Sequence, residues 1–338
     1  MNFNTTRFLS NKFLIKLTRP FLLVSAFILL CSHDLYIKME TYFLQPNQEA
    51  TLSLYNGTFE LSENTIARDR LLDASVVAHQ KRTSISDEQW SDQDSTITQF
   101  HFKTGDTGTY VVGVSTKART LQQTASSFNG YLKHDGVIDM LREREDNNEL
   151  EDDVVESYQK HVKAIYQVGD SKTEDWKTVL GYPIEFVPLE NPYKKYSGES
   201  LDVQLLMDGK PLPNQLLYAD YISATHHHHH GDHSHDAADH SHTNGQRFRT
   251  DAKGIVTLLL PEDGIYYLRT IHMEKMDGNK EFTHQSKWST LTFEVTHKHG
   301  EHTHTHDHHH EEEIPTGIFV FGSILVIGIL FMYFRKKD

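Results

Sequence analysis

The sequence predicts a mainly β protein with two β-sandwich domains joined by a helical segment, an N-terminal signal peptide and one C-terminal transmembrane helix. Its 338 residues suit two domains of about 150 residues each. A hydrophobic fraction of 37% and an aromatic fraction of 11% supply enough apolar surface for ordinary cores. Between the two ends, most apolar runs are short, rich in Val, Ile, Thr and Tyr, and separated by turn-forming clusters, which is typical of strands.

Residues 1–32 have the layout of a signal peptide. They contain four basic residues and no acidic residue, and they end in the apolar run 20–30. Cleavage after Ser32 would make His33 the first residue of the exported chain. Cys31 offers a lipoprotein anchor as the alternative, although Leu30 stands where such a motif has Gly or Ala.

Residues 314–334 are predicted to form a transmembrane helix. This run of 21 residues carries no charge, and at about 1.5 Å per residue it spans a hydrocarbon core of about 30 Å. Three basic residues follow it in the tail 335–338, which places the tail in the cytoplasm. We therefore expect a single-pass membrane protein whose ectodomain is periplasmic or extracellular.

The first sandwich is expected at 33–118 and a helical connector at 119–180. Five strands are predicted in the sandwich: 35–39, 50–55, 74–78, 97–102 and 109–114. In the connector, apolar residues recur at spacings of three and four (Tyr158, Val162, Ile165, Tyr166), and acidic residues crowd 143–153. This texture predicts one or two helices between residues 122 and 168.

The second sandwich is expected at 181–296. Its predicted strands are 184–189, 201–207, 216–222, 255–260, 265–272 and 289–295. Turn motifs precede or separate them at 207–213, 250–254 and 261–264. The order of these turns and strands resembles small sandwiches of the transthyretin-like type, so both domains are expected to be immunoglobulin-like or transthyretin-like.

Four segments in order resemble one exported family: His33-Asp34-Leu35-Tyr36, Gly108-Thr109-Tyr110, residues 180–193, and Ile271-His272-Met273 followed by 288–293. This family is described as periplasmic components of cobalt and nickel ABC-type transport systems and is often labelled a domain of unknown function. The resemblance covers nearly all of 33–295. It implies metal-related biology outside the cytoplasm, with the membrane and ATPase subunits of a metal transporter as partners.

Two histidine tracts hold 17 of the 24 histidines. The first lies in an insertion at 225–246, and the second lies in a His- and Glu-rich stalk at 297–313. The candidate metal ligands of the first tract are His226, His227, His228, His229, His230, His233, His235, His240 and His242. Those of the second tract are His297, His299, His302, His304, His306, His308, His309 and His310.

Imidazole is a borderline ligand that suits Ni, Co, Zn and Cu, so the tracts predict binding of a divalent transition metal ion. Neighbouring carboxylates add negative charge. An expression tag is the simplest alternative, but both tracts are internal. A solvated spacer or a pH-responsive stalk is the other alternative, because histidine titrates near pH 6.5.

Two further histidines are candidate ligands. An N-terminal His33 would combine an α-amine with an imidazole, a chelating pair that suits Cu(II) or Ni(II). His272 on the predicted strand 265–272 could complete such a site or be a hydrogen-bonded core residue. Strand alternation places His272 and Met273 on opposite faces.

Several function classes are disfavoured by composition. The segment 33–313 has 26 basic and 46 acidic residues, a net charge of −20, which argues against nucleic-acid binding. A single cysteine excludes an internal disulfide framework and a Cys-rich zinc site. Common motifs of nucleotide-binding, serine hydrolase and metalloprotease sites are missing, so no catalytic or cofactor-binding residues are predicted. A structural cell-surface module with histidine-rich spacers remains the alternative to a metal-binding accessory protein.

Metal binding by the tracts should fall steeply between about pH 7 and pH 5, because protons compete for imidazole near its pKa of about 6.5. Titration of the ectodomain with Ni²⁺ at a series of pH values measures this. Binding that stays constant across the window would exclude histidine as the main ligand.

Overall fold

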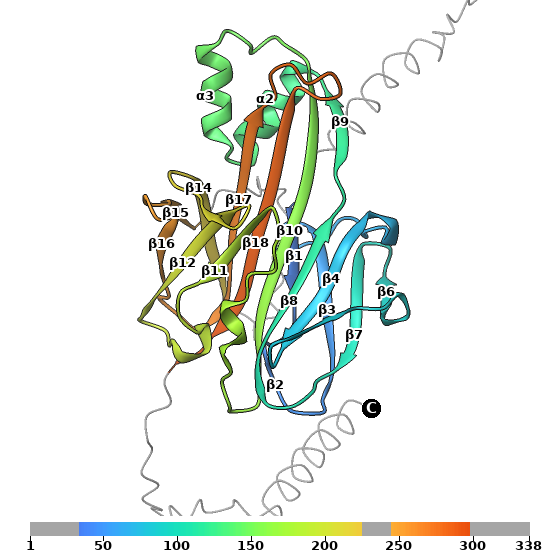
Figure 1. Ribbon diagram of the computed structural model, residues 1–338, viewed down its shortest axis with the longest axis vertical. Helices are drawn as coiled ribbons and strands as arrows, with labels where there is room; N and C mark the ends of the chain where they lie inside the picture. The colour runs from blue at the N-terminus through green and yellow to red at the C-terminus, as the bar shows by residue number, and fades with distance from the viewer. Residues whose placement is uncertain (1–33, 225–244, 298–338) are drawn as a thin grey trace, which may run out of the picture. The chain divides into compact units, whose positions relative to one another are not determined.

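A central ten-stranded sheet runs through the part of the chain that the computed structural model describes, residues 34–224 and 245–297 (Figure 1). Eight of its strands follow the order β15-β14-β17-β18-β10-β8-β4-β5, and the short strands β2 and β9 pair with β10. The bounds are β2 Phe43–Leu44, β4 Leu71–Ala78, β5 Lys81–Ser84, β8 Gly108–Thr116, β9 Arg119–Gln123, β10 Val154–Val168, β14 Leu216–Ser223, β15 Gln246–Arg249, β17 Gly264–Lys275 and β18 His284–Val295.

Two smaller sheets complete the architecture. The first has the order β1-β3-β7-β6, and the second consists of β11, β12, β13 and β16. Their bounds are β1 Asp34–Lys38, β3 Glu49–Gly57, β6 Trp90–Gln93, β7 Ile97–Lys103, β11 Ile184–Pro188, β12 Ser200–Met207, β13 Lys210–Pro211 and β16 Ile255–Leu259. Four 3₁₀ turns lie at Arg68–Arg70, Asp87–Gln89, Glu174–Lys177 and Pro192–Lys194.

The small sheets contact opposite faces of the central sheet. Thr290 of β18 donates its hydroxyl to Leu35 O of β1, whereas Lys163 of β10 contacts Glu185 of β11. Thr290 pairs with Val162, the neighbour of Lys163. Because successive side chains of a strand point to opposite faces, these contacts come from the two faces of one sheet.

The predicted helix over the second half of the connector is wrong. Residues 154–168 form β10, which pairs in parallel with β18 and antiparallel with β8 and β9. All nine residues from Lys160 to Val168 are buried. A strand covered on both faces loses the polar–apolar alternation that identifies a strand, so its apolar residues can coincide with helical spacing.

Two helices, α2 Ala125–His134 and α3 Ile138–Asp146, form the part of the connector that is helical (Figure 1). Thr124 caps α2 by accepting a hydrogen bond from Ser127 N. The helices enclose their own apolar cluster: Phe128, Tyr131, Leu132, Val137, Met140, Val154, Ile271 and Trp288. The helical hairpin is thereby fixed to β10, β17 and β18.

The eleven strands predicted for the two sandwiches are confirmed within a few residues at their ends. The two sandwiches, however, are not separate domains in the structure. Strands β4 and β8 from the first half and β14, β17 and β18 from the second half belong to one sheet through β10. One apolar core cluster likewise contains residues from both halves.

Within residues 34–224 and 245–297, no helix has both the length and the apolar character needed to cross a bilayer. The expected signal peptide (1–32) and transmembrane segment (314–334) lie outside the described residues.

Edge strand β1 is covered by side-chain donors. Thr290 and Thr292 of β18 donate their hydroxyls to Leu35 O (2.9 Å) and Ile37 O (2.7 Å), and Tyr42 OH also donates to Ile37 O (3.0 Å). An edge strand with unpaired backbone groups is a template for unwanted pairing, and these hydroxyls occupy its acceptors.

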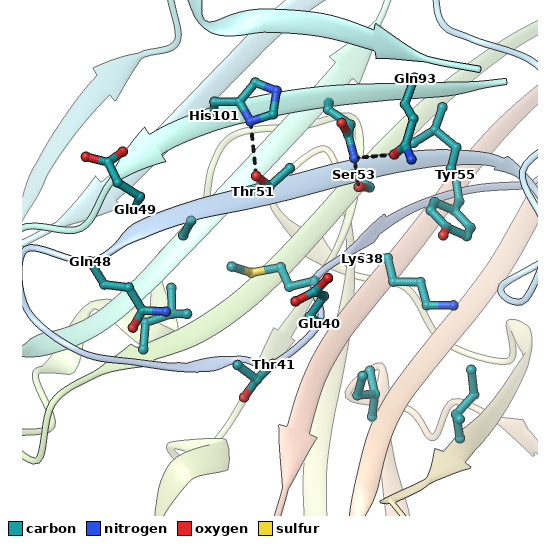
Figure 2. A pocket seen from close by; sticks show the side chains of 17 residues that line it. Lys38, Glu40, Thr41, Gln48, Glu49, Thr51, Ser53, Tyr55, Gln93 and His101 are labelled. Carbon is teal, nitrogen blue, oxygen red and sulfur yellow. Dashed lines mark hydrogen bonds between the residues drawn. The ribbon is translucent and has the colours of Figure 1, made fainter. Parts of the chain in front are cut away.

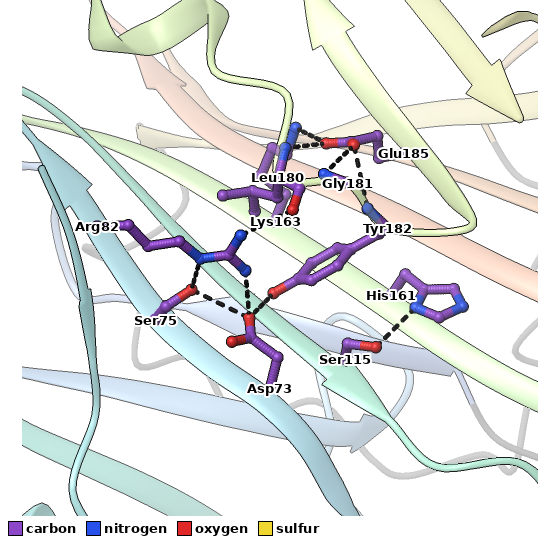
Figure 3. Close-up of polar contacts among 10 residues, drawn as sticks. All are labelled: Asp73, Ser75, Arg82, Ser115, His161, Lys163, Leu180, Gly181, Tyr182 and Glu185. Atoms are coloured by element: carbon purple, nitrogen blue, oxygen red, sulfur yellow. Dashed lines mark hydrogen bonds and ion pairs between the residues drawn. The ribbon is translucent and has the colours of Figure 1, made fainter. Parts of the chain in front are cut away.

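A buried ion pair joins β10 to β11 (Figure 3). Lys163 Nζ lies 2.6 Å from Glu185 Oε2, and both side chains are 2% exposed. Lys163 also donates to Phe186 O (2.9 Å), while the Glu185 carboxylate accepts from the backbone N–H groups of residues 180, 181 and 182. Burial lowers the pKa of Lys163, and the Glu185 charge opposes that shift.

Replacing Lys163 with Met should lower the free energy of unfolding by about 3–5 kcal/mol, because it leaves the Glu185 carboxylate buried without its counter-ion. The matched control is Lys177→Met, which removes an exposed pair with Glu174 and should leave stability nearly unchanged. Urea unfolding of the two variants makes the comparison. Equal effects would contradict the assigned importance of the buried pair.

Candidate functional site

The two histidine tracts begin at the same end of the central sheet. The first tract lies within residues 225–244, between Ala224 and Gly245, and β14 ends just before it at Ser223. Ser223 pairs with Gly264 of β17, and Gly264 pairs with Val295, the last residue of β18. Neighbouring strands lie about 4.8 Å apart, so these strand ends lie within about 10 Å of each other.

Asp263 connects the starting points of both tracts. Its carbonyl oxygen accepts the N–H of Ala224 (3.0 Å), and its carboxylate contacts Nδ1 of His297. Ser197 Oγ donates to the other carboxylate oxygen (2.7 Å). Burial alone would raise the pKa of Asp263, but the hydrogen bonds from His297 and Ser197 outweigh it and lower that pKa.

Contacts of Glu262 and Gly264, the residues on either side of Asp263, fix the turn that carries it. Tyr266 OH donates to Glu262 O (2.7 Å) and accepts from Glu262 N (3.2 Å). Gly264 is required where the turn enters β17, because a Cβ there would lie 2.2 Å from Ile222 O. Asp263 is therefore held at a defined position.

Of the 19 histidines predicted as ligands, the structure describes His272 and His297. The others lie outside the described residues: His33, His226, His227, His228, His229, His230, His233, His235, His240, His242, His299, His302, His304, His306, His308, His309 and His310. In residues 34–224 and 245–297, no three His, Cys, Asp or Glu side chains are grouped closely enough to hold a metal ion.

His272 does not lie at the end of the central sheet where Ala224 and His297 contact Asp263. It lies eight residues along β17 from Gly264, which is roughly 26 Å on a strand. Its Nδ1 pairs with Gln215 Oε1 (2.8 Å), and burial lowers its pKa. Met273 packs against the apolar cluster of the helices, on the other face, as strand alternation predicts. This geometry fits the core-residue alternative for His272.

Asp34, the first described residue, directly follows His33 in the sequence and is buried. Asp34 Oδ2 lies 2.7 Å from Arg269 Nε and accepts from Tyr36 OH (3.0 Å). Arg269 also donates to Asp135 O (3.1 Å) in the loop between the two helices. Asp34 is therefore fixed in a buried ionic contact.

This contact belongs to a buried polar layer that sequence reasoning missed. Glu156 is fully buried and accepts from Gln123 (3.1 Å), from Tyr131 (3.3 Å) and from Ser286. Burial raises the pKa of Glu156 to about 7, although the hydrogen bonds from Ser286 and Tyr131 oppose this. Burial also lowers the pKa of Lys160 to about 8. In the sequence these residues carry no common motif.

His161 is buried in a row of polar residues (Figure 3). Its Nδ1 lies 2.9 Å from Ser115 Oγ, and burial lowers its pKa to about 4. Nearby, Tyr182 OH donates to Asp73 (2.6 Å), which also pairs with Arg82. His161 is thus neutral at physiological pH.

A cleft of about 570 Å³ lies next to the start of the first tract (Figure 2). Its lining comes from residues 38–55, from residues 93–101, and from Ile222 and Ile265. Lys38 Nζ donates to Phe59 O (2.9 Å) and lies 4.7 Å from the centre of the Tyr55 ring. His101 lies between Thr51 (3.0 Å) and Ser91 (2.7 Å). Lys38 and His101 are therefore both engaged in polar contacts with neighbouring residues.

Glu156→Gln should stabilise the protein at alkaline pH and change little near pH 4.5. A carboxyl whose pKa rises from 4.5 to about 7 on folding costs stability progressively between those two values, roughly 3 kcal/mol in full. Because Gln stays neutral, its advantage should appear as the pH rises through this window. Thermal unfolding at pH 4.5, 6 and 8 measures it, and an advantage independent of pH would contradict the assignment.

Comparison with solved structures finds similar chains at about 10% sequence identity. The D0–D1 domain of intimin (10% identity) covers 77% of this chain and 97% of its own, with a TM-score of 0.20. The Ig1–Ig3 ectodomain of mouse nectin-like molecule 4 (10%) covers 80% and 66%, with a TM-score of 0.18. The titin Ig tandem A164–A165 (10%) covers 79% and 95%, with a TM-score of 0.16. TM-scores this low carry no argument about function.

No curated protein matches the sequence. A family model does match, over residues 30–274, and its description is a domain of unknown function, DUF4198. The match crosses both predicted sandwiches and the connector, in keeping with the shared central sheet. The chain therefore belongs to the DUF4198 family.

Proposed function

We propose that this protein is a membrane-anchored, extracytoplasmic metal-binding accessory protein for the uptake or buffering of nickel or cobalt, with zinc and copper as alternatives. The observation that carries the proposal is the common starting point of the two tracts at Asp263. The sequence separates Ala224 from His297 by more than 70 residues, whereas in the structure both contact Asp263.

A common starting point concentrates the ligands. A chain of 20 residues between Ala224 and Gly245 can extend at most roughly 35 Å from its anchors. Nine imidazoles confined to such a volume correspond to a local concentration on the order of 0.1 M. The second tract starts within the same volume, so ions released by one tract can be captured by the other.

Charge supports the same function. The segment 33–313 has a net charge of −20, which raises the local concentration of cations around it. Carboxylates also alternate with histidines in both tracts, at Asp232, Asp236, Asp239, Glu301 and Asp307. Hard carboxylates and borderline imidazoles together suit divalent transition metals.

Two partners are proposed. One is the membrane itself, and the other is a metal transporter, through its membrane and ATPase subunits. The second tract leads from His297 to the predicted membrane span at Ile314. The transporter subunits are proposed on the family resemblance described above.

A structural cell-surface module with histidine-rich spacers is the competing proposal. In that case the tracts would serve as solvated linkers, and the common starting point would have no consequence for metal content. The two proposals differ in one measurable quantity, the amount of metal bound by the exported part of the chain.

Replacing all 17 tract histidines with Ser should remove most of the bound Ni²⁺ or Co²⁺ while leaving thermal stability nearly unchanged. The measurement is metal content by elemental analysis after purification without a metal-affinity resin. The control replaces three exposed histidines outside the tracts, His79, His101 and His134, and should keep the full complement. Full binding by the 17-fold variant would favour the structural module.

A further inference from the structure

We infer that Asp263 and His297 form a metal anchor on the folded domain, in which the Asp263 carboxylate and the His297 imidazole are two fixed ligands for a divalent transition metal ion. This inference deepens the proposed function, because the anchor takes the same ions as the tracts. Both residues lie in the described part of the chain, and Asp263 lies outside the two tracts.

The geometry of the pair is close to that of two neighbouring metal ligands. Asp263 Oδ2 and His297 Nδ1 are in hydrogen-bond contact. Two ligand atoms about 2.1 Å from one ion, at tetrahedral or octahedral angles, lie about 3.0–3.5 Å apart. Moving the two atoms roughly 1 Å further apart would therefore admit an ion between them, with water in the remaining coordination positions.

The carboxylate is oriented before any ion arrives. Ser197 Oγ donates to Oδ1 of Asp263 (2.7 Å), which directs Oδ2 towards His297. The braced turn at Glu262 and the close packing of Gly264 on Ile222 fix the backbone. A carboxylate held in this way loses little conformational entropy on binding.

The backbone just before His297 is held in place after the end of β18. Thr296, the residue before His297, pairs with Tyr196 in a parallel bridge, and its carbonyl accepts from Ser197 N (3.2 Å). Ser197 thus contacts both sides of the pair. The His297 side chain is 60% exposed and that of Asp263 is 24% exposed, so an ion can reach them from solvent.

An ion at this position would lie between the beginnings of the two tracts, because Asp263 also accepts the N–H of Ala224. The fold contributes two ligands whose positions are fixed.

The test uses the full chain with 16 tract histidines replaced by Ser and His297 retained. Titration with Co²⁺, followed by its visible absorption and by calorimetry, should show one bound ion per chain. Asp263→Asn and His297→Ala in this background should each weaken that site at least tenfold. Ser197→Ala, a positioning change, should weaken it by a smaller factor, and the far-ultraviolet circular dichroism of all variants should match the parent.

The matched control is Asp146→Asn, which removes the same charge from an exposed position at the end of α3. It should leave Co²⁺ affinity unchanged. The anchor is wrong if the 16-fold variant binds no ion, or if Asp263→Asn binds as tightly as its parent. The tract proposal is judged separately, by the metal lost between the natural chain and the 17-fold variant, so either can fail without the other.

Discussion

The rest of the structure depends on the parallel pairing of β10 with β18. β10 follows helix α3 and β18 is the last described strand, and their nine paired positions join segments more than 120 residues apart. On its other edge β10 pairs with β8 from the first half. The backbone N–H and C=O groups of a strand covered on both faces need hydrogen-bond partners within the sheet. This requirement joins strands of the two predicted sandwiches into one sheet.

The same pairing determines where the candidate metal-binding end lies. β18 also pairs with β17 along twelve positions, and β17 pairs with β14. This register places the last residue of β14, the turn at Asp263 and the last residue of β18 at one end of the sheet. A shift of one residue in either ladder would turn the side chains of β17 or β18 to the other face. The proximity of the tracts is therefore a consequence of strand register.

At a different place in the central sheet, the fold buries charge. Asp34, Arg269, Glu156 and Lys160 lie between the first small sheet and the helices, and burial shifts the pKa values of Glu156 and Lys160 towards neutrality. Taking carboxylates and ammonium groups out of water costs free energy that only good pairing offsets. The layer fixes the start of β1 while making stability depend on pH. Its separation from Asp263 means that the polar layer and the proposed anchor can be altered independently.

The sequence by itself determined the strand content, the positions of eleven strands, the two histidine tracts and the acidic character of the chain. These properties are local, because strand alternation, turn residues and composition act over a few neighbouring residues. It misassigned β10, since a strand buried on both faces carries no alternation. Only the tertiary structure decided that Asp263 meets Ala224 and His297, that His272 lies far from them along β17, and that Glu156 is buried among hydroxyl and amide donors. Contacts of this kind depend on strand order and register, which arise from packing across the whole chain and leave no pattern in any single segment.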